Sequence, residues 1–249
     1  AHELSKWGDL EGQRAIIRFF LSHRWSDGSV PHRYGRDYEI LQTMQFGASD
    51  CLLISLIHQH FCDAKDTVFL KECYPAVLQL WNGLRQKAGP GGFIRGLGFY
   101  PDNPRAMGRT ETGVTSLETG AFYLAARLLA ELAAVCGDEK TAEEAVQAAD
   151  LIESNYLCHF FDPGTGGLLD GLDERGNPNI IYPLYDYLAV HSRRGLALFL
   201  PKIGPISTFI QQNYLTDWGI RTLPARDPRT HTESVHHSWY LHWDIHALK

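Results

Sequence analysis

The apolar residues of this chain recur at helical spacing, in segments of two kinds. In the first kind the apolar positions lie on one stripe, and in the second they lie nearly all round the helix. The one-sided segments are 10–23, 66–88 and 138–156, those apolar all round are 49–62 and 116–135, and three more helical segments are 184–200, 206–215 and 238–248. A one-sided helix covers a core, whereas a helix apolar all round lies inside one. The alternation therefore predicts hairpins that pair an inner helix with an outer one.

The links between these segments alternate in length. Inner helices lead to outer ones through short links, at 63–65 and 137–138. Outer helices lead back through long links, at 24–48, 89–115, 158–183 and 216–237. Antiparallel helices joined in this way gather their long loops at one end, where long loops often carry function. No strand-type alternation competes, so the pattern predicts an all-α toroid of helical hairpins, while a linear solenoid of the same period stays open.

The two inner helices and the mostly apolar segment 184–200, which is taken as a third inner helix, each begin with an acidic residue, and these acids are equally spaced along the chain. They are Asp50, Glu118 and Asp186. A carboxylate in the first turn of a helix interacts favourably with the helix dipole, so each acid fits a simple structural role. The same positions also fit a ring of acids around one cavity mouth, and both roles can hold together.

Seven stretches, in chain order between about Gly8 and His246, resemble the motifs of a known family. They are RWSDGSVP at 24–31, ASD at 48–50 with the CLLISLIHQHF that follows, DTVFLKECYP at 66–75, LETGAF at 117–122, FFDPGTGGLLD at 160–170, LTDWGIRTLP at 215–224 and HHSWYLHW at 236–243. Together they resemble the six-hairpin (α/α)6-barrel glycosidases, most of all the amylo-α-1,6-glucosidase domain of glycogen-debranching enzymes. The family has a further hairpin before Gly8 and more helices after Lys249. The resemblance therefore implies one barrel domain over 1–249 that lacks the terminal hairpins.

The resemblance implies a glycoside hydrolase that acts on α-linked glucosides or related oligosaccharides with inversion. Such a reaction needs two carboxyl groups, one to protonate the leaving oxygen and one to activate water. The family's acid motif T-W-M-D corresponds to Phe99-Tyr-Pro-Asp102, so Asp102 is the candidate acid, although Asp-Asn-Pro also fits a plain turn. Glu118 and Glu233 are the candidate bases, with Glu111 behind them; a helix cap at Glu118 and a solvated loop acid at Glu233 are the alternatives.

Sugar binding combines aromatic faces with polar groups at the rim. The expected substrate-binding residues lie on or beside the long-loop end and are Trp25, Arg33, Asp50, Tyr100, Tyr185, Asp186, Arg221, His237 and Trp239. For each aromatic residue, packing in the core is the alternative to stacking on a sugar.

Charge and composition exclude several other classes. The net charge of −6 over 249 residues argues against a binder of duplex nucleic acid, which needs a basic face. The chain has no run of 18 consecutive apolar residues, so no membrane span is expected. The five cysteines lack CxxC spacing, so they are expected to be buried structural thiols in a reducing, cytoplasmic setting. Five histidines at 231–246 lack the HExxH pattern, and phosphate-binding loops are missing, so no metal or other cofactor is expected.

Two other functions stay open. The first is a carbohydrate-binding or scaffold module without catalysis, and the second is a helical toroid of another class, such as a metal-dependent cyclase. If the barrel is open, its inner helices expose apolar surface, which predicts self-association or a missing partner segment.

Overall fold

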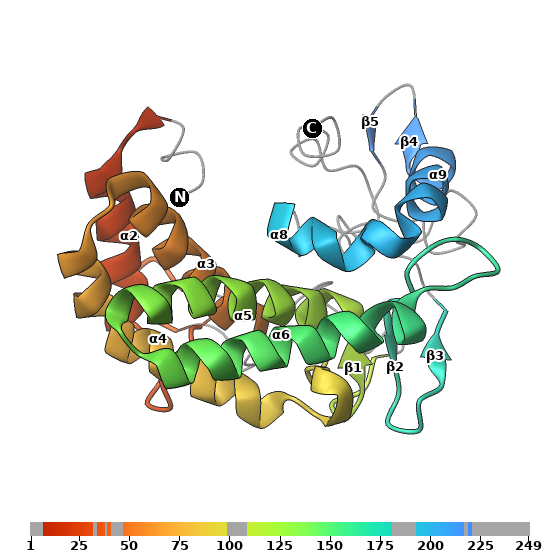
Figure 1. Ribbon diagram of the computed structural model, residues 1–249, viewed down its shortest axis with the longest axis horizontal. Coiled ribbons are helices and arrows are strands. Elements are labelled where there is room, and N and C mark those ends of the chain that lie inside the picture. The colour runs from red at the N-terminus through yellow and green to blue at the C-terminus, as the bar shows by residue number, and fades with distance from the viewer. Residues whose placement is uncertain are drawn as a thin grey trace. The chain divides into compact units, whose positions relative to one another are not determined.

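The computed structural model shows a largely helical chain whose contacts divide it into two compact units (Figure 1). The first unit comprises Ala1–Ile94 and Ala121–Ile152, and the second comprises Arg95–Gly120 and Glu153–Lys249. The residues that the structure describes are 7–31, 34–37, 39–40, 47–98, 109–180, 193–216 and 219–220.

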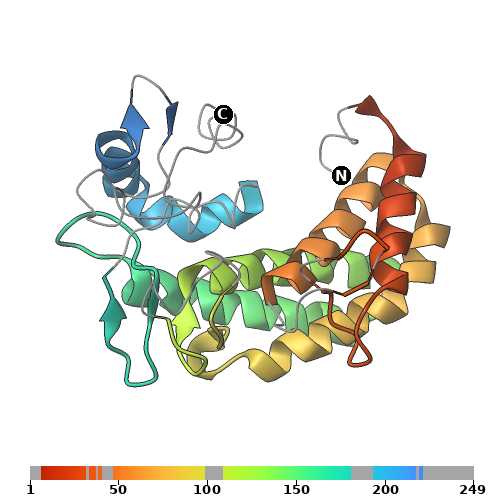
Figure 2. The same ribbon diagram turned by 180° about the vertical axis from the view of Figure 1, so that it is seen from behind.

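Three helices open the first unit: α2 (Leu10–Ser22), α3 (Gly47–Ala64) and α4 (Thr67–Lys87). Figures 1 and 2 show α2 and α3 side by side, and α3 also packs on α4. Asp66 caps α4, because its carboxylate accepts hydrogen bonds from the N–H groups of Val68 and Phe69 at 3.0 and 2.9 Å. The α3–α4 turn is therefore as short as the sequence predicts.

A second hairpin consists of α5 (Ser116–Cys136) and α6 (Glu139–Phe160). Gly137 turns the chain with φ of 78°, a left-handed conformation that glycine adopts without strain. The Asp138 carboxylate then accepts the Thr141 N–H at 3.0 Å and caps α6. Among the described helices, α5 alone is long and apolar enough to cross a membrane, but 67% of that apolar window is buried in the protein, which is typical of a core helix.

The second unit adds short strands and further helices. Its β1 (Val114–Thr115), β2 (Gly171–Leu172) and β3 (Pro178–Asn179) form an antiparallel sheet in the order β1-β2-β3, with Thr115 opposite Gly171 and Gly171 opposite Asn179. The remaining elements are a 3-10 turn η1 in the first unit (Pro90–Gly92), and α8 (Arg193–Leu196), η2 (Ala197–Lys202), α9 (Ile203–Asn213), β4 (Leu215–Thr216) and β5 (Gly219–Ile220) in the second.

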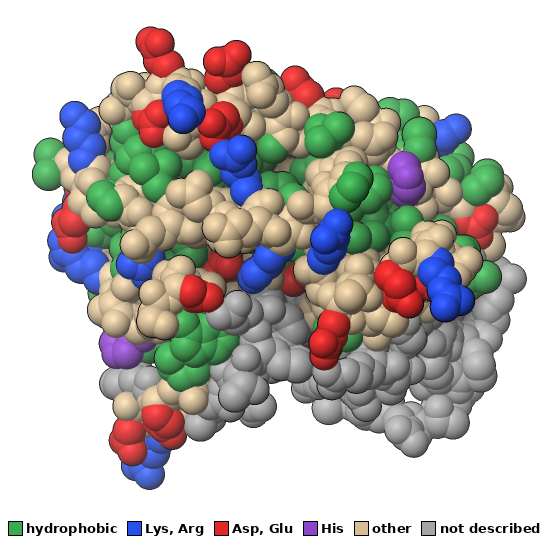
Figure 3. Space-filling view, turned by 90° about the horizontal axis from the view of Figure 1, so that it is seen from below, with side chains coloured by type: hydrophobic (Ala, Val, Ile, Leu, Met, Phe, Trp, Pro, Cys, Tyr) green, Lys and Arg blue, Asp and Glu red, His purple; other side chains and the backbone are tan. Residues whose placement is uncertain are grey.

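The expected alternation of helix types is visible in the burial of the side chains. Ten residues of α3 are buried, whereas in α2 the buried residues are Gln13 and Ile17. On the described part of the face in Figure 3, acidic and basic side chains are interspersed with apolar ones. The outer helices α2 and α4 carry the exposed Arg18–Glu72 pair, whereas the inner helix α3 is largely buried.

Three expectations were wrong. The sequence shows no strand-type alternation, yet β1 pairs with β2 across the long links at 89–115 and 158–183. The last expected helix within the described residues begins at Ile203 rather than 206 and ends at Asn213. The cysteines are all free, but only Cys51 and Cys73 are buried, and Cys158 is exposed. Helix 238–248 and the segment 184–192 lie outside the described residues.

Candidate active site

The carboxyl group in the first turn of α5 is buried within the second unit. Glu118 is 2% exposed, and its backbone N–H donates to the Thr115 hydroxyl at 3.3 Å. Thr115-Ser-Leu-Glu118 has the spacing of a capping box, so the position has a structural role at the helix start. The Glu118 carboxylate also lies close to Gly96, since a Cβ at Gly96 would lie 3.6 Å from Oε2.

A buried ion pair fixes the loop that precedes α5. Asp170 is fully buried and Arg109 is 6% exposed. Arg109 donates from Nε to Asp170 Oδ2 at 2.7 Å and from Nη2 to Oδ1, and its Nη1 donates to the Leu97 carbonyl at 3.1 Å. Asn179 adds an amide donor to Oδ2 at 2.9 Å. Because two nitrogens of the guanidinium donate to the two oxygens of one carboxylate, the orientation of the Arg109 side chain is fixed. The pair therefore ties the segment before β1 to the segment around β2.

Glycines allow this close packing. A Cβ at Gly98 would lie 2.4 Å from Arg109 Nη1, and one at Gly171 would lie 2.3 Å from the Val114 carbonyl oxygen. Both approaches are too short for any side chain. Gly171 directly follows the Gly-Gly-Leu-Leu-Asp stretch at 166–170, and at Gly171 the backbone of β2 lies against β1.

A small hollow opens beside this pair. It is lined by Gly96, Arg109, Thr110, Gly113, Val114, Thr115, Gly171, Leu172 and Asn179. Gly96 lines the hollow and also lies against the Glu118 carboxylate, so it separates the buried acid from the hollow. The lining includes hydroxyl, amide and guanidinium groups, and of these the Arg109 guanidinium and the Asn179 amide already donate to Asp170.

A second buried carboxylate opens α3 in the first unit. Asp50 is 1% exposed, and its Oδ1 accepts the Val30 N–H at 2.8 Å. Lys87, the last residue of α4, places Nζ 3.9 Å from Asp50 Oδ2, and this Nζ atom is buried without a hydrogen-bond partner among the described residues. The loop from Trp25 to Val30 is thus fixed to the start of α3, with a cation close by.

The structure places four of the sequence-predicted site residues, and of these Glu111 is exposed in the loop before β1. Asp50 and Glu118 each lie in the first turn of their helix, as predicted. Trp25 is half-buried in the loop after α2, and its backbone N–H donates to the Ser29 carbonyl at 3.0 Å. The other expected residues, Asp102, Glu233, Arg33, Tyr100, Tyr185, Asp186, Arg221, His237 and Trp239, lie outside the described residues, as do the five histidines at 231–246.

Sequence reasoning missed the polar partners of these acids. Asp170 ends one of the recognised motifs, which was a signal that it mattered, but nothing in the sequence pairs it with Arg109. Lys87 has an ordinary position at the end of an amphipathic helix, and no pattern distinguishes it. Within the described ranges, no group of three or more histidine, cysteine, aspartate or glutamate side chains is arranged to hold a metal ion.

Several glycosidases of known structure have a similar fold. A family GH78 rhamnosidase of Bacillus sp. GL1 matches with a TM-score of 0.51 at 15% identity, covering 63% of this chain and 17% of its own. A rhamnosidase from Klebsiella oxytoca, solved with rhamnose bound, matches at 0.58 and 12% identity, covering 79% and 37%. A GH63 mannosylglycerate hydrolase from Thermus thermophilus, solved with Tris and D-glycerate, matches at 0.60 and 12% identity, covering 87% and 73%.

These matches establish the fold alone. The chain spans less than two fifths of the length of either rhamnosidase. No protein family's sequence profile matches the chain, and no curated protein matches it in sequence. The helical fold expected from the sequence is confirmed as one shared with glycoside hydrolases. The specific likeness to debranching enzymes stays a prediction.

Proposed function

We propose that this chain carries the active site of an inverting glycoside hydrolase that acts on α-linked glucosides or related oligosaccharides. The observation that supports this most is the buried Glu118 carboxylate. It lies against Gly96, which lines a small hollow, in a chain whose fold is shared with glycosidases. The proposal assigns Glu118 as the carboxylate that takes a proton from the attacking water.

The partner acid in this proposal is Asp102. It would protonate the oxygen of the leaving sugar while the water attacks the opposite face of the ring, and inversion requires about 6.5–9.5 Å between the two carboxyl groups. Asp102 precedes Arg109 by seven residues on the same segment of chain. The buried Arg109–Asp170 pair supports the assignment, because it fixes the end of that segment next to α5.

The start of α3 is proposed as a sugar-binding position of the same enzyme. The Nζ atom of Lys87 is buried 3.9 Å from the Asp50 carboxylate, without a hydrogen-bond partner among the described residues. A buried ammonium group without such partners is costly, and a sugar hydroxyl would satisfy it. Asp50 and Lys87 would then bind one hydroxyl group as acceptor and donor.

The test measures sugar release from a panel of α- and β-linked oligosaccharides, with the anomer of the product read by NMR. We expect release of the inverted anomer, and at least about a hundredfold loss in Glu118→Gln and in Asp102→Asn, because a general acid or base contributes roughly 10²–10⁴-fold. Glu143→Gln is the matched control, since Glu143 is exposed on α6 and bonds Gln147. Circular dichroism on every variant checks the fold.

The outcomes separate the proposal from its alternative. Full activity in a folded Glu118→Gln variant would remove Glu118 from the mechanism and leave it as a helix-capping residue. Sugar binding without release by the parent chain would favour the non-catalytic carbohydrate-binding module. A cytoplasmic location and self-association are not decided by this experiment and stay predictions.

A further inference from the structure

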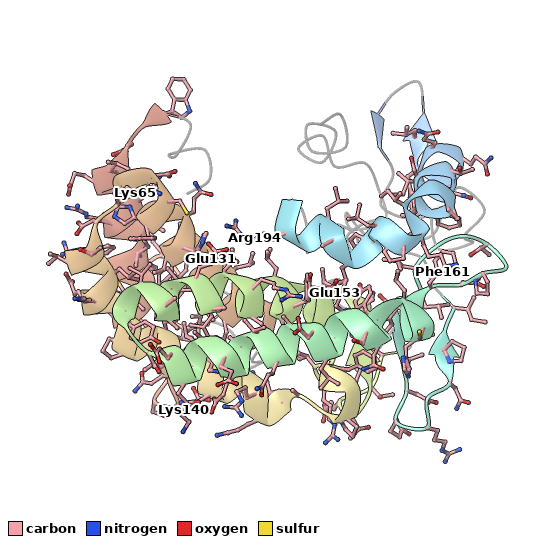
Figure 4. The ribbon with its side chains drawn as sticks, viewed as in Figure 1. Lys65, Glu131, Lys140, Glu153, Phe161 and Arg194 are labelled. Atoms are coloured by element: carbon pink, nitrogen blue, oxygen red, sulfur yellow. The ribbon has the colours of Figure 1, made fainter. Side chains whose placement is uncertain are left out.

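A chain of polar side chains holds α2 on α3 and α4 at one end of the first unit. Lys65, labelled in Figure 4, marks the turn between α3 and α4 at this end. The buried residues of α2 are Gln13 and Ile17. The Gln13 amide nitrogen donates to Asp63 Oδ2 at 2.9 Å, and the Gln13 oxygen lies 2.9 Å from Nδ1 of His60, which is 1% exposed. One of the two buried positions of α2 therefore makes hydrogen bonds rather than apolar contacts.

These contacts define the tautomer of the His60 ring. A carboxylate only accepts, so the Gln13 nitrogen faces Asp63 and the Gln13 oxygen is left to accept from His60. Nδ1 of His60 therefore carries the proton, and Nε2 keeps its lone pair. Arg14 Nε donates to this Nε2 at 3.4 Å. The network needs a neutral ring, because a proton on Nε2 would face the Arg14 donor.

Charged groups of three helices surround the ring. Arg14 of α2 also donates to Glu11 and to Asp66, the residue that caps α4, and Asp63 lies one turn after His60 on α3. The three carboxylates favour a protonated ring, whereas burial and the Arg14 cation disfavour it. Burial has the largest effect and Arg14 the next, and together they hold the pKa of His60 below its ordinary 6.5.

Phe69 of α4 completes the surroundings of the ring. Its side chain is 3% exposed and meets His60 edge to face, with ring centroids 5.0 Å apart. The guanidinium groups of Arg14 and Arg18 lie over Phe69, 5.6 and 5.1 Å from its centre. Arg18 also pairs with Glu72 at 3.1 Å, but both side chains are exposed, and such pairs contribute little. The attachment of α2 therefore depends mainly on its buried contacts.

We propose that α2 is a pH-controlled element, docked on α3 and α4 at neutral pH and released when His60 takes up a proton at Nε2. The added proton displaces the Arg14 donor and places a second cation beside it in a buried position. Water solvates the imidazolium better than the buried site does, so protonation favours the released state. Release exposes Ile17 and one face of Phe69. An apolar surface therefore appears in acid and is covered again at neutral pH.

His60 has different pKa values in the docked and released states. In the released state it titrates near its ordinary value of about 6.5, and in the docked state its pKa is lower. The docked state is therefore at full stability above pH 6.5 and loses stability as pH falls toward the lower pKa. At pH 5.5 about nine tenths of the released state is protonated, so the opening equilibrium increases by up to about tenfold.

The test measures hydrogen exchange of backbone amides in the intact chain between pH 7.5 and 5.5, with each rate corrected for the intrinsic pH dependence of exchange. Ordinary carboxyl groups titrate near pH 4, below this range. We expect protection at Ile17 to fall by about three- to tenfold, and protection at Ala149, which is fully buried on α6, to stay constant. Constant protection at Ile17 would overturn the proposal. An equal fall at both positions would overturn it as well, because the opening would then be global.

His60→Gln should abolish the fall in α2, because an amide keeps a hydrogen-bonding group at this position but does not titrate. His159→Gln is the matched control, since His159 is exposed on α6 and bonds the Asn155 carbonyl at 2.9 Å, and it should leave the fall unchanged. Arg14→Gln should reduce the fall, because it removes the cation that disfavours protonation of His60. A full fall in folded His60→Gln would contradict the proposal. If His60→Gln does not fold, an unchanged fall in Arg14→Gln would contradict it in the same way.

Discussion

Replacing Asp170 by asparagine should lower the stability of the second unit more than Glu118→Gln or Asp102→Asn does. Asp170 is fully buried, and its two carboxylate oxygens accept from Arg109 and from the amide of Asn179. The substitution removes the counter-charge from the Arg109 guanidinium, which is only 6% exposed. Removing one partner of a buried ion pair typically costs about 3–5 kcal/mol. Since a domain is stable by only about 5–15 kcal/mol, this is a large fraction of the total.

Hydrogen exchange of the Ser116 backbone N–H measures the effect locally. This amide donates to the Asp170 carbonyl oxygen at 2.9 Å, so it exchanges when the contact between α5 and the segment around β2 opens. A loss of about 3 kcal/mol corresponds to exchange faster by about a hundredfold or more. Asp150→Asn is the control, because the Asp150–Arg127 pair, at 2.9 Å, is partly exposed and such pairs contribute about 0–1 kcal/mol.

A double variant separates charge from packing. In Arg109→Met with Asp170→Leu, both charges are gone, and buried ion pairs replaced by apolar side chains often lose little stability. We therefore expect the double variant to recover at least half of the loss seen in Asp170→Asn. A loss below about 1 kcal/mol in Asp170→Asn would refute the reasoning, because it would mean that the guanidinium finds solvent or another partner without cost.

Three further outcomes follow from the described contacts. Gly171→Ala should break the pairing of β1 with β2, because the new Cβ would meet a backbone carbonyl at 2.3 Å; faster amide exchange in both strands is the readout. The hydrogen bond from the Phe69 N–H, more than any other contact, holds the pKa of Asp66 below its usual 3.8. The stability that Asp66 contributes is therefore full above pH 3.8 and is lost as pH falls through the lower pKa of the folded state. Urea unfolding from pH 6 to 2 should show a smaller decline in stability for Asp66→Asn than for the parent chain. Leu132→Ala should cost about 2–5 kcal/mol of unfolding free energy, while Val135→Ala on the same helix, 40% exposed, should cost about 1 kcal/mol or less by the same urea titration.

The helices of the hairpins could be predicted from the sequence because their pattern is long. Twenty-one residues of α5 repeat the same apolar preference, and the structure begins that helix at Ser116, as predicted. At the far end of α6 the prediction was short by four residues. The helix continues to Phe160, which is fully buried and whose carbonyl oxygen accepts the Leu169 N–H at 2.7 Å. Tertiary contact, rather than local pattern, therefore decides where this helix ends.

The sheet and the polar pairs could not be predicted, for two physical reasons. Strands of two residues, such as β1 and β2, are too short to show any alternation, and their pairing depends on the close approach that Gly171 permits. The partners Arg109 and Asp170 are far apart in the chain, and no local rule relates them. The first-turn acids Asp50 and Glu118 were predicted because helix geometry is local, but their buried neighbours come from other elements.

The two roles proposed for Glu118, helix capping and catalysis, are both consistent with this geometry. A capping box needs a glutamate three residues after Thr115, and the same position turns the side chain toward the long-loop end of the helix, where Gly96 leaves room for a carboxylate. Capping alone would be satisfied by a solvent-exposed glutamate, so it does not explain why Glu118 is 2% exposed beside a small hollow. Gly96 lies against the Glu118 carboxylate, and the next residue, Leu97, accepts a hydrogen bond from Arg109, so the stability of the ion pair and the activity proposed for Glu118 should be lost together.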